Sequence, residues 1–528
     1  MLLRTQYFLL LLLLILASFT AAQKKEIVAY YAGPHRIYQK NLLKDLDKNG
    51  SADKITVLCY AFAFPRPDSS GNIIPMIDAA FTYQKLFPGN MSIDGVADSP
   101  AQSLRGVFNQ LKKLKARYSN IKVLLSIGGW GGSTYFSDLA LTPESRERFV
   151  DTCIDMYIKG NLPLFDSAGG KGAAKGVFDG FDIDWEFPVS GGPEGTHYNP
   201  NDRENMSALF SLFRKKLDII HPGFLLTAAI SGRVWEFWKY NFDEDKKNLN
   251  WFNVMTYDFH GFGDSVTGHN TNLLSSPEDP DPYKESYDHA VKYLMDSAGI
   301  SGSKIVPGAA FYARIWRNID SVNYGLYQPV DYKSEQDLIG YSHFENFSDK
   351  ILNNNKSHWD DLAMAPWLYN PEDKTFWSFD DTRSIALKQR YVDAYNLRGL
   401  MFWAVNGDDS AGTLINTIYN KNMPDYYSYI PKTDNILPEI EITEPADKVN
   451  IKEGSNIRIV TDVKDRDGTV VKVEFFVDGI SIGYNTIAPF DWVWFNASSG
   501  KHQIKAVAFD NNGGKSSSTP FVINIINK

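Results

Sequence analysis

Short apolar runs separated by longer mixed segments constrain the fold of this chain more than any other feature. The eight runs are 26–33, 54–64, 121–130, 176–187, 224–232, 251–261, 304–316 and 397–407. Between them, 99–118 and 287–299 have the apolar spacing of amphipathic helices. Strands that are apolar on both faces and alternate with helical crossovers are typical of parallel sheets covered by helices. The sequence therefore predicts an α/β fold of the TIM (β/α)8 barrel type rather than an open sheet.

Two further regions depart from this alternation. About eighty residues separate the last two runs, which is too long for a bare loop, and 324–347 and 364–381 look like short strands and turns. We expect an inserted α+β subdomain at about 315–378, standing as a wall above the barrel. The barrel domain would span 23–430, followed by a linker at 431–437.

The last ninety or so residues alternate polar and apolar side chains, with turns about every eight to twelve residues. This pattern predicts an all-β, immunoglobulin-like sandwich at 438–528. Its role is open between ligand binding, spacing and surface attachment. Trp492 and Trp494 share one strand face, where they would suit either the sandwich core or a flat binding platform.

The N-terminal residues predict export. One Arg precedes an apolar run from Tyr7 to Leu16, and small residues follow up to Ala22. This is the pattern of a signal peptide at 1–22. An uncleaved anchor is the alternative, but the run is short for a membrane span, and no later run is long enough. We therefore expect a secreted protein with no membrane span.

Charge and cysteine content exclude several function classes. A formal charge of −9 over 528 residues provides no broad basic face for nucleic acid or anionic lipid. The two cysteines, Cys59 and Cys153, both lie in apolar segments, so a disulfide framework is not expected. We predict a monomer without metal or cofactor, acting on a neutral or cationic substrate.

The run at 176–187 carries the strongest functional signal. Because strand residues alternate between faces, Asp182, Asp184 and Glu186 would share the inward face near the carboxyl end of the strand, where barrel enzymes keep their active sites. Like charges at that spacing favour one protonated carboxyl group, which is what a general acid requires. A site for a hard cation and a solvated edge strand are the alternatives. Catalysis is favoured because the opposite face carries large apolar side chains.

The D-x-x-D-x-D-x-E arrangement from Asp179 to Glu186 resembles the signature of family 18 glycoside hydrolases, the chitinases and their relatives. Other strand ends are similar to the same family, namely "SIGG" at 126–129, "MTYD" at 255–258, "FYAR" at 311–314 and Trp403. The segment between the last two runs resembles that family's insertion domain. The resemblance covers about Glu26 to Ile418.

This resemblance implies a retaining, substrate-assisted reaction in which the 2-acetamido oxygen of the sugar attacks the anomeric carbon. Glu186 would then be the acid and base. Asp184 would hold the acetamide N–H and stabilise the developing positive charge, with its carboxyl group within hydrogen-bonding reach of Glu186. Asp182 would share a proton with Asp184, assisted by Tyr30 and Ser126, so that the three carboxyl groups titrate together.

The resemblance also implies the substrate contacts. Tyr257 would hydrogen-bond the acetamide carbonyl, although a core aromatic is the alternative, and Asp258 would bind the distorted sugar. Arg314 would bind sugar or bridge the barrel and the insertion, and Met255 belongs to the same strand-end motif as Tyr257. Trp403 would form the floor under the reacting sugar. Further candidates for sugar contacts are Trp130, Tyr312, Trp235, Trp316 and Trp367.

Two departures affect the substrate contacts rather than the catalytic residues. Gly263 stands where many relatives have a tryptophan that supports the sugar beyond the scissile bond, leaving Phe262 as a partial substitute, and Ala313 replaces a usual glycine. The leading hypothesis is a chitinase acting on chitin or N-acetylglucosamine oligosaccharides. An endo-β-N-acetylglucosaminidase acting on N-glycans and a non-catalytic chitin-binding lectin are the alternatives.

Overall fold

The computed structural model describes residues 25–33, 42–261, 263–330, 340–349, 357–360, 362–419, 436–446, 450–511 and 514–527. The predicted signal peptide at 1–22, Phe262 and residues 431–435 of the predicted linker lie outside this range. The chain divides into two units. The first runs to Tyr419 except for Asp393–Tyr395, and the second contains Asn420–Lys528.

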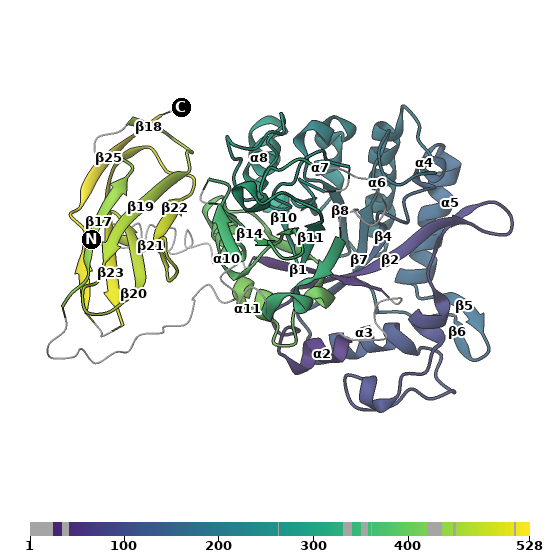
Figure 1. The fold of residues 1–528 in the computed structure, drawn as a ribbon. Helices are drawn as coiled ribbons and strands as arrows, with labels where there is room; N and C mark the ends of the chain where they lie inside the picture. The colour runs from purple at the N-terminus through teal and green to yellow at the C-terminus, as the bar shows by residue number, and fades with distance from the viewer. Residues whose placement is uncertain are drawn as a thin grey trace, which may run out of the picture. The chain divides into compact units, whose positions relative to one another are not determined.

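The first unit is built on a closed parallel barrel (Figure 1). Its strands are β1 (Glu26–Ala32), β2 (Val57–Pro67), β4 (Lys122–Gly128), β7 (Gly180–Asp184), β8 (Leu225–Ser231), β9 (Trp251–Met255), β10 (Ile305–Ala310) and β16 (Gly399–Trp403). Each pairs in parallel with its neighbours in this order, and β1 closes the barrel by pairing with both β2 and β16. The predicted barrel is confirmed, and each apolar run supplies one of its strands.

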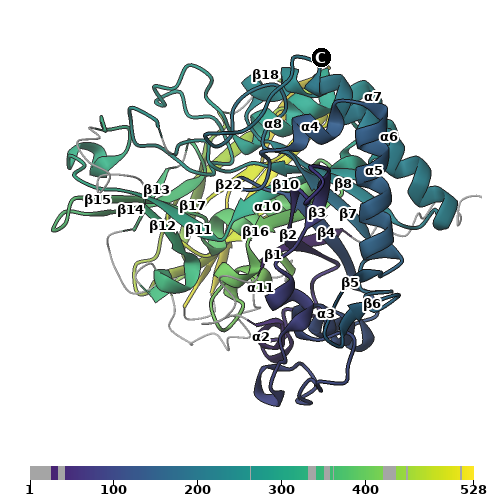
Figure 2. The same ribbon diagram turned by 90° about the vertical axis from the view of Figure 1, so that its right-hand side faces the viewer.

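Helices cover the outside of the barrel (Figures 1 and 2). They are α2 (Leu43–Lys48), α3 (Gly106–Arg117), α4 (Phe136–Ala140), α5 (Pro143–Cys153), α6 (Asp202–Ile220), α7 (Phe242–Asn248), α8 (Tyr287–Lys292), α10 (Thr382–Ala394) and α11 (Thr413–Tyr419). The helix expected at 99–118 is shorter, because the Asp98 carboxylate accepts hydrogen bonds from the backbone N–H of Gly106 and of Phe87 and so fixes the preceding residues in a turn. Likewise, α8 ends at Lys292 and continues as a π-helical turn, Tyr293–Ser297.

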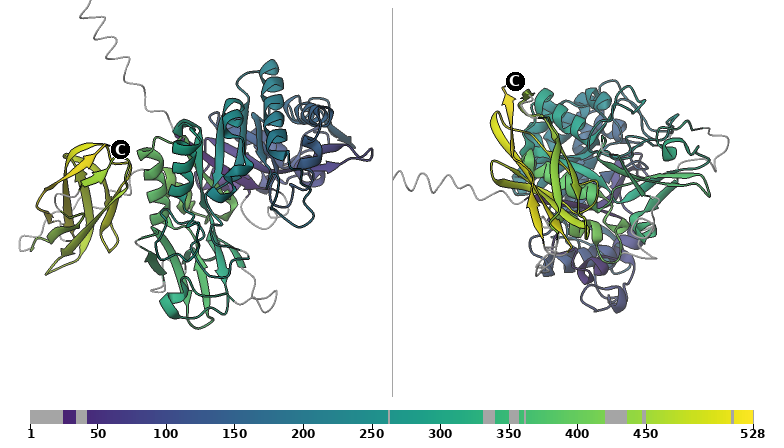
Figure 3. Two further views of the ribbon diagram at one scale, coloured as in Figure 1. Left: turned by 90° about the horizontal axis from the view of Figure 1, so that it is seen from above. Right: turned by 60° about the vertical axis from the view of Figure 1, so that its left-hand side comes forward.

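The insertion forms its own antiparallel sheet in the order β12-β11-β15-β14-β13. Its strands are β11 (Tyr312–Trp316), β12 (Gly340–His343), β13 (Ser357–Asp360), β14 (Ala365–Asn370) and β15 (Thr375–Ser378). These strands gather in a separate layer at one side of the first unit (Figure 2; Figure 3, left). Trp316 and Trp367 are buried in the core of this layer, so neither offers a surface to a sugar.

The second unit is a β-sandwich, as predicted. One sheet has the order β17-β19-β22, and the other has the order β18-β25-β23-β20-β21, with β24 on β23. The bounds are β17 (Glu439–Glu444), β18 (Asn450–Lys452), β19 (Ile457–Lys464), β20 (Val470–Val477), β21 (Ile480–Asn485), β22 (Asp491–Trp494), β23 (Gly500–Asp510), β24 (Lys515–Ser517) and β25 (Phe521–Ile526). Trp492 is buried and stacks on Phe475, and Trp494 packs against the same core, so the core interpretation of Trp492 holds.

Candidate active site

The carboxylate-bearing strand is shorter than its apolar run. β7 ends at Asp184, and Glu186 lies just beyond it. The loop after β4 takes over the backbone hydrogen bonds there, because Ser133 Oγ donates to the Asp184 carbonyl at 3.1 Å and accepts from the Glu186 N–H at 2.9 Å. Trp185 points the opposite way and stacks on Phe136 of α4. Glu186 is thereby placed at the mouth of the barrel rather than along its wall.

Asp182 is the innermost carboxylate and is fully buried. It accepts four hydrogen bonds, from Tyr30 at 2.9 Å, Ser126 at 2.8 Å, Thr227 at 2.6 Å and Asn253 at 3.0 Å. Burial raises the pKa of Asp182, while these donors oppose the rise. The expected contacts of Tyr30 and Ser126 are thus made with Asp182.

Two of these donors were missed in the sequence. Thr227 lies on β8 and Asn253 on β9, each at an inward position of an otherwise apolar strand. Asn253 also donates to the Tyr30 hydroxyl at 3.1 Å, which links three strands around Asp182. A polar residue at an inward position of a buried strand was the signal that could have identified both.

Asp184 and Glu186 are held differently from Asp182. Burial raises the pKa of Asp184 well above its ordinary value, and the charges of Glu186 and Asp182 raise it further. Burial, with the charges of Asp258 and Glu236, raises the pKa of Glu186 to about 8. Among the described residues no hydrogen bond joins Asp184 to either neighbour, and its Oδ1 atom is buried without a partner. The expected hydrogen bond between the Asp184 and Glu186 carboxyl groups is therefore not formed in this structure.

Asp179, the first residue of the motif, lies at the other end of the strand. Its carboxylate accepts the Val123 N–H at 2.8 Å and pairs with Lys115 at 2.7 Å. These contacts join the start of the strand to β4 and α3. Asp179 therefore belongs to the fold rather than to the site.

Tyr257 and Asp258 follow β9, which is separated from β7 by one strand, β8, around the barrel. Asp258 accepts hydrogen bonds from the Tyr312 hydroxyl at 2.8 Å and from Arg314 Nε at 2.7 Å. Since Tyr312 and Arg314 belong to β11, Arg314 bridges the barrel and the insertion, which was one of the two roles considered for it. The Tyr312 ring is buried and packs edge-on against Tyr257, so it reaches the site through its hydroxyl group.

The aromatic candidates differ in exposure. Trp403 is half-buried and stacks on Phe62 with ring centroids 5.6 Å apart. Trp130 is 57% exposed and follows the glycines that end β4. Trp235 is 41% exposed, and its ring lies 5.7 Å from that of Tyr283. These rings offer open faces, whereas Met255, at the end of β9, is half-buried against the barrel core.

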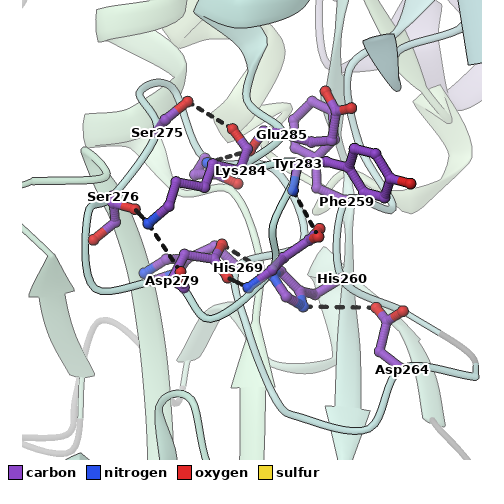
Figure 4. Close-up of polar contacts among 12 residues, drawn as sticks. Phe259, His260, Asp264, His269, Ser275, Ser276, Asp279, Tyr283, Lys284 and Glu285 are labelled. Atoms are coloured by element: carbon purple, nitrogen blue, oxygen red, sulfur yellow. Dashed lines mark hydrogen bonds and ion pairs between the residues drawn. The ribbon is translucent and has the colours of Figure 1, made fainter. Parts of the chain in front are cut away.

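Ion pairs and hydrogen bonds among its own side chains and backbone stabilise the loop after Asp258 (Figure 4). His260 Nε2 lies 3.0 Å from Asp279, and its Nδ1 lies 3.6 Å from Asp264. The Lys284 ammonium donates to the Pro277 carbonyl at 2.8 Å, in the same loop. Across the described residues, no group of three or more His, Cys, Asp and Glu side chains could hold a metal ion.

Gly263, which stands where many relatives have a tryptophan, lies in this loop, and the described residues leave the space beside it open. No heavy atom of the described chain lies within 4 Å of where its Cβ would be. An aromatic support for a sugar beyond the scissile bond would therefore have to come from another residue.

Comparisons with known proteins match both units. Residues 26–408 match glycosyl hydrolases family 18, and residues 438–506 match a bacterial Ig domain. Chitinase A1 of Niallia circulans is 32% identical over 362 residues, covering 66% of this chain and 48% of that protein. Chitinase C of Streptomyces lividans is 30% identical over 384 residues, covering 71% of this chain and 56% of that protein.

Among solved structures, the catalytic domain of the psychrophilic chitinase B from Arthrobacter TAD20 is 32% identical, with a TM-score of 0.69. The match covers 75% of this chain and 95% of that one. This chain therefore spans about half the length of the two curated relatives, whereas it contains nearly all of the solved catalytic domain.

Proposed function

Because the chain belongs to glycosyl hydrolases family 18, we propose that it is a secreted chitinase that cleaves β-1,4 bonds between N-acetylglucosamine units with retention. The observation that carries the proposal is Glu186, a carboxyl group at the barrel mouth whose pKa is raised to about 8. Such a group still holds its proton at neutral pH, as a general acid must.

In the first step Glu186 gives its proton to the glycosidic oxygen, and the bond from that oxygen to the anomeric carbon breaks. The acetamido oxygen of the same sugar forms a bond to that carbon, giving an oxazolinium ion. Asp184 accepts a hydrogen bond from the acetamide N–H and stabilises the positive charge. Its unpartnered buried Oδ1 atom supports this role, because the substrate would satisfy it.

In the second step the Glu186 carboxylate takes a proton from water, and the water oxygen attacks the anomeric carbon. The bond between that carbon and the acetamido oxygen breaks, which restores the acetamido group. Two displacements on the same carbon retain its configuration, and Glu186 ends the cycle protonated. Asp182 remains in its ring of four donors and acts on the reaction through its charge on Asp184. Tyr257 fixes the acetamide carbonyl for the attack.

The remaining residues position the sugar. Asp258, held by Arg314 and Tyr312, binds the distorted ring, and Trp403 forms its floor. The exposed Trp130 supports a neighbouring sugar, and Met255 packs beside the acetamido group. No helix in the described ranges is both long and apolar enough to cross a bilayer. We assign export to the segment 1–22 and propose a monomer that binds chitin or its oligosaccharides.

The test is product analysis by mass spectrometry with chitin oligosaccharides and, separately, with an N-glycopeptide. The wild type should release short oligosaccharides from chitin. Glu186→Gln should lose about 10²–10⁴-fold in rate, and the control Glu204→Gln, an exposed carboxylate on α6, should match the wild type. Cleavage of the glycopeptide alone would identify an endo-β-N-acetylglucosaminidase. Binding without any cleavage would identify a lectin.

A further inference from the structure

A buried ion pair lies close to the segment that follows the proposed acid Glu186. It belongs to the 3-10 turn Val234–Lys239, which follows β8. Lys239 Nζ lies 2.8 Å from Glu236 Oε1, and the two side chains are 2% and 8% exposed. Removing two charges from water costs free energy, so a buried ion pair is not retained for solubility and indicates another role.

Lys239 contacts the segment that follows Glu186. Its ammonium donates to the Ser190 carbonyl at 2.8 Å and lies 5.2 Å from the centre of the Phe187 ring. Gly191 leaves room for it, because a Cβ there would come within 3.2 Å of Lys239 Nζ. The lysine thus ties down the backbone immediately after the acid.

Glu236 connects the pair to the barrel wall. Its Oε2 atom accepts a hydrogen bond from the Ser231 hydroxyl at the end of β8. β8 is the strand that pairs with β7, which leads into Glu186. Glu236, Lys239 and Ser190 therefore form a chain of contacts from the neighbouring strand to the far side of the acid.

We propose that Glu236 and Lys239 are positioning residues for the acid Glu186, holding the segment 187–191 against β8 and fixing the net charge that the acid faces. The inference rests on the proposed role of Glu186. It adds two buried residues that lie outside the motif from Asp179 to Glu186.

The other groups around Glu186 define what this pair contributes. Asp184 faces the acid from β7, Tyr257 and Asp258 from the end of β9, and Tyr240 from the segment after the 3-10 turn. Asp258 and Glu236 are the two acids whose charges raise the pKa of Glu186, and each has its own cation, Arg314 and Lys239 respectively. Removing one member of the Glu236–Lys239 pair therefore changes the charge near the acid by one unit.

The test is the pH profile of kcat/KM on a chitin oligosaccharide, whose alkaline limb reports the acid of the free enzyme. Glu236→Gln leaves the Lys239 charge uncompensated, which disfavours the protonated acid and should move the limb down by about half to one pH unit. Lys239→Met leaves the Glu236 charge uncompensated and should move the limb up by a similar amount. Lys239→Arg keeps charge and donors and should restore the wild-type limb.

Shifts of the alkaline limb in opposite directions for Glu236→Gln and Lys239→Met, with the wild-type limb restored in Lys239→Arg, would support the proposed positioning role. An unchanged limb, or shifts in the same direction in folded variants, would overturn the proposal. A purely structural role would lower the amount of active protein but would not move the alkaline limb according to the charge removed. If one single variant does not fold, the other carries the test by its own sign, with the neutral pair Glu236→Gln/Lys239→Met as its reference. Glu186→Gln is measured in parallel: if it remains active, the proposed function fails rather than this inference.

Discussion

Two buried carboxyl groups in the first unit, Asp380 and Asp184, differ in whether a cation and hydrogen-bond donors surround them. Asp380, after β15, accepts Lys388 Nζ on both oxygens at 2.8 and 2.7 Å, and both side chains are fully buried. Ser384 and the Ala310 N–H complete its hydrogen bonds. At the barrel mouth, by contrast, Asp184 has neither a cation nor a partner for Oδ1 among the described residues.

The difference teaches which group serves the fold and which serves a reaction. A buried carboxylate that is paired and fully hydrogen-bonded costs little further free energy and is fixed in one state. A buried carboxyl group left unpaired among like charges destabilises the fold, and such groups concentrate where a substrate or proton must be bound. Removing charge from the two groups should therefore have opposite effects.

The largest expected effect is on stability at the paired group. Lys388→Met leaves Asp380 buried without its cation and should destabilise the protein by about 3–5 kcal/mol, measured by urea unfolding. The activity of the remaining folded protein should be unchanged. The control is Lys247→Met, which removes an exposed pair with Glu244 and should change stability little. Equal losses in both variants would show that the burial of Lys388 is not what matters.

At the mouth, Asp184→Asn should act the other way. It removes a carboxyl group whose charged form is disfavoured by burial and by the charge of Asp182, so the thermal midpoint should rise, while kcat should fall about 10²–10³-fold because the positive intermediate loses its stabilising charge. Asp179→Asn, directly before the same strand, is the matched control. It breaks the pair with Lys115, so it should lower stability and leave kcat unchanged. A stabilised and fully active Asp184→Asn variant would remove Asp184 from the mechanism.

The sequence predicted the part of this comparison that depends on strand alternation. The eight barrel strands were recognisable because both of their faces are apolar. Asp182 and Asp184 were placed together on the inward face because successive strand residues alternate between the two faces. Alternation could not show that β7 stops at Asp184, because the stop depends on Ser133 from another strand's loop. Nor could it pair Arg314 with Asp258, since fifty-six positions separate them along the chain.

The protonation of Glu186 at the barrel mouth should give a smaller effect, seen in the pH dependence of activity and stability. Activity needs protonated Glu186, so kcat/KM should fall about tenfold per pH unit above about 8. Because the folded pKa of Glu186 lies above its ordinary value of 4.5, the folded state binds the proton more tightly than the unfolded state. Stability should therefore decline as pH rises from about 5 to 8. In Glu186→Gln this part of the decline should disappear, and an unchanged decline would place the titration elsewhere.

The smallest effect extends the comparison from charges to aromatic rings. Trp185 is buried against Phe136, whereas Trp130 is 57% exposed at the end of the adjacent strand β4. An exposed indole contributes little to folding, so Trp130→Ala should leave the thermal midpoint unchanged. Loss of a stacking surface worth about 0.5–1.5 kcal/mol should raise KM for long chitin oligosaccharides about two- to tenfold. Trp238→Ala, at 56% exposure, is the control for loss of an exposed indole. If Trp130→Ala and Trp238→Ala raise KM equally, Trp130 does not provide a specific stacking surface for the sugar.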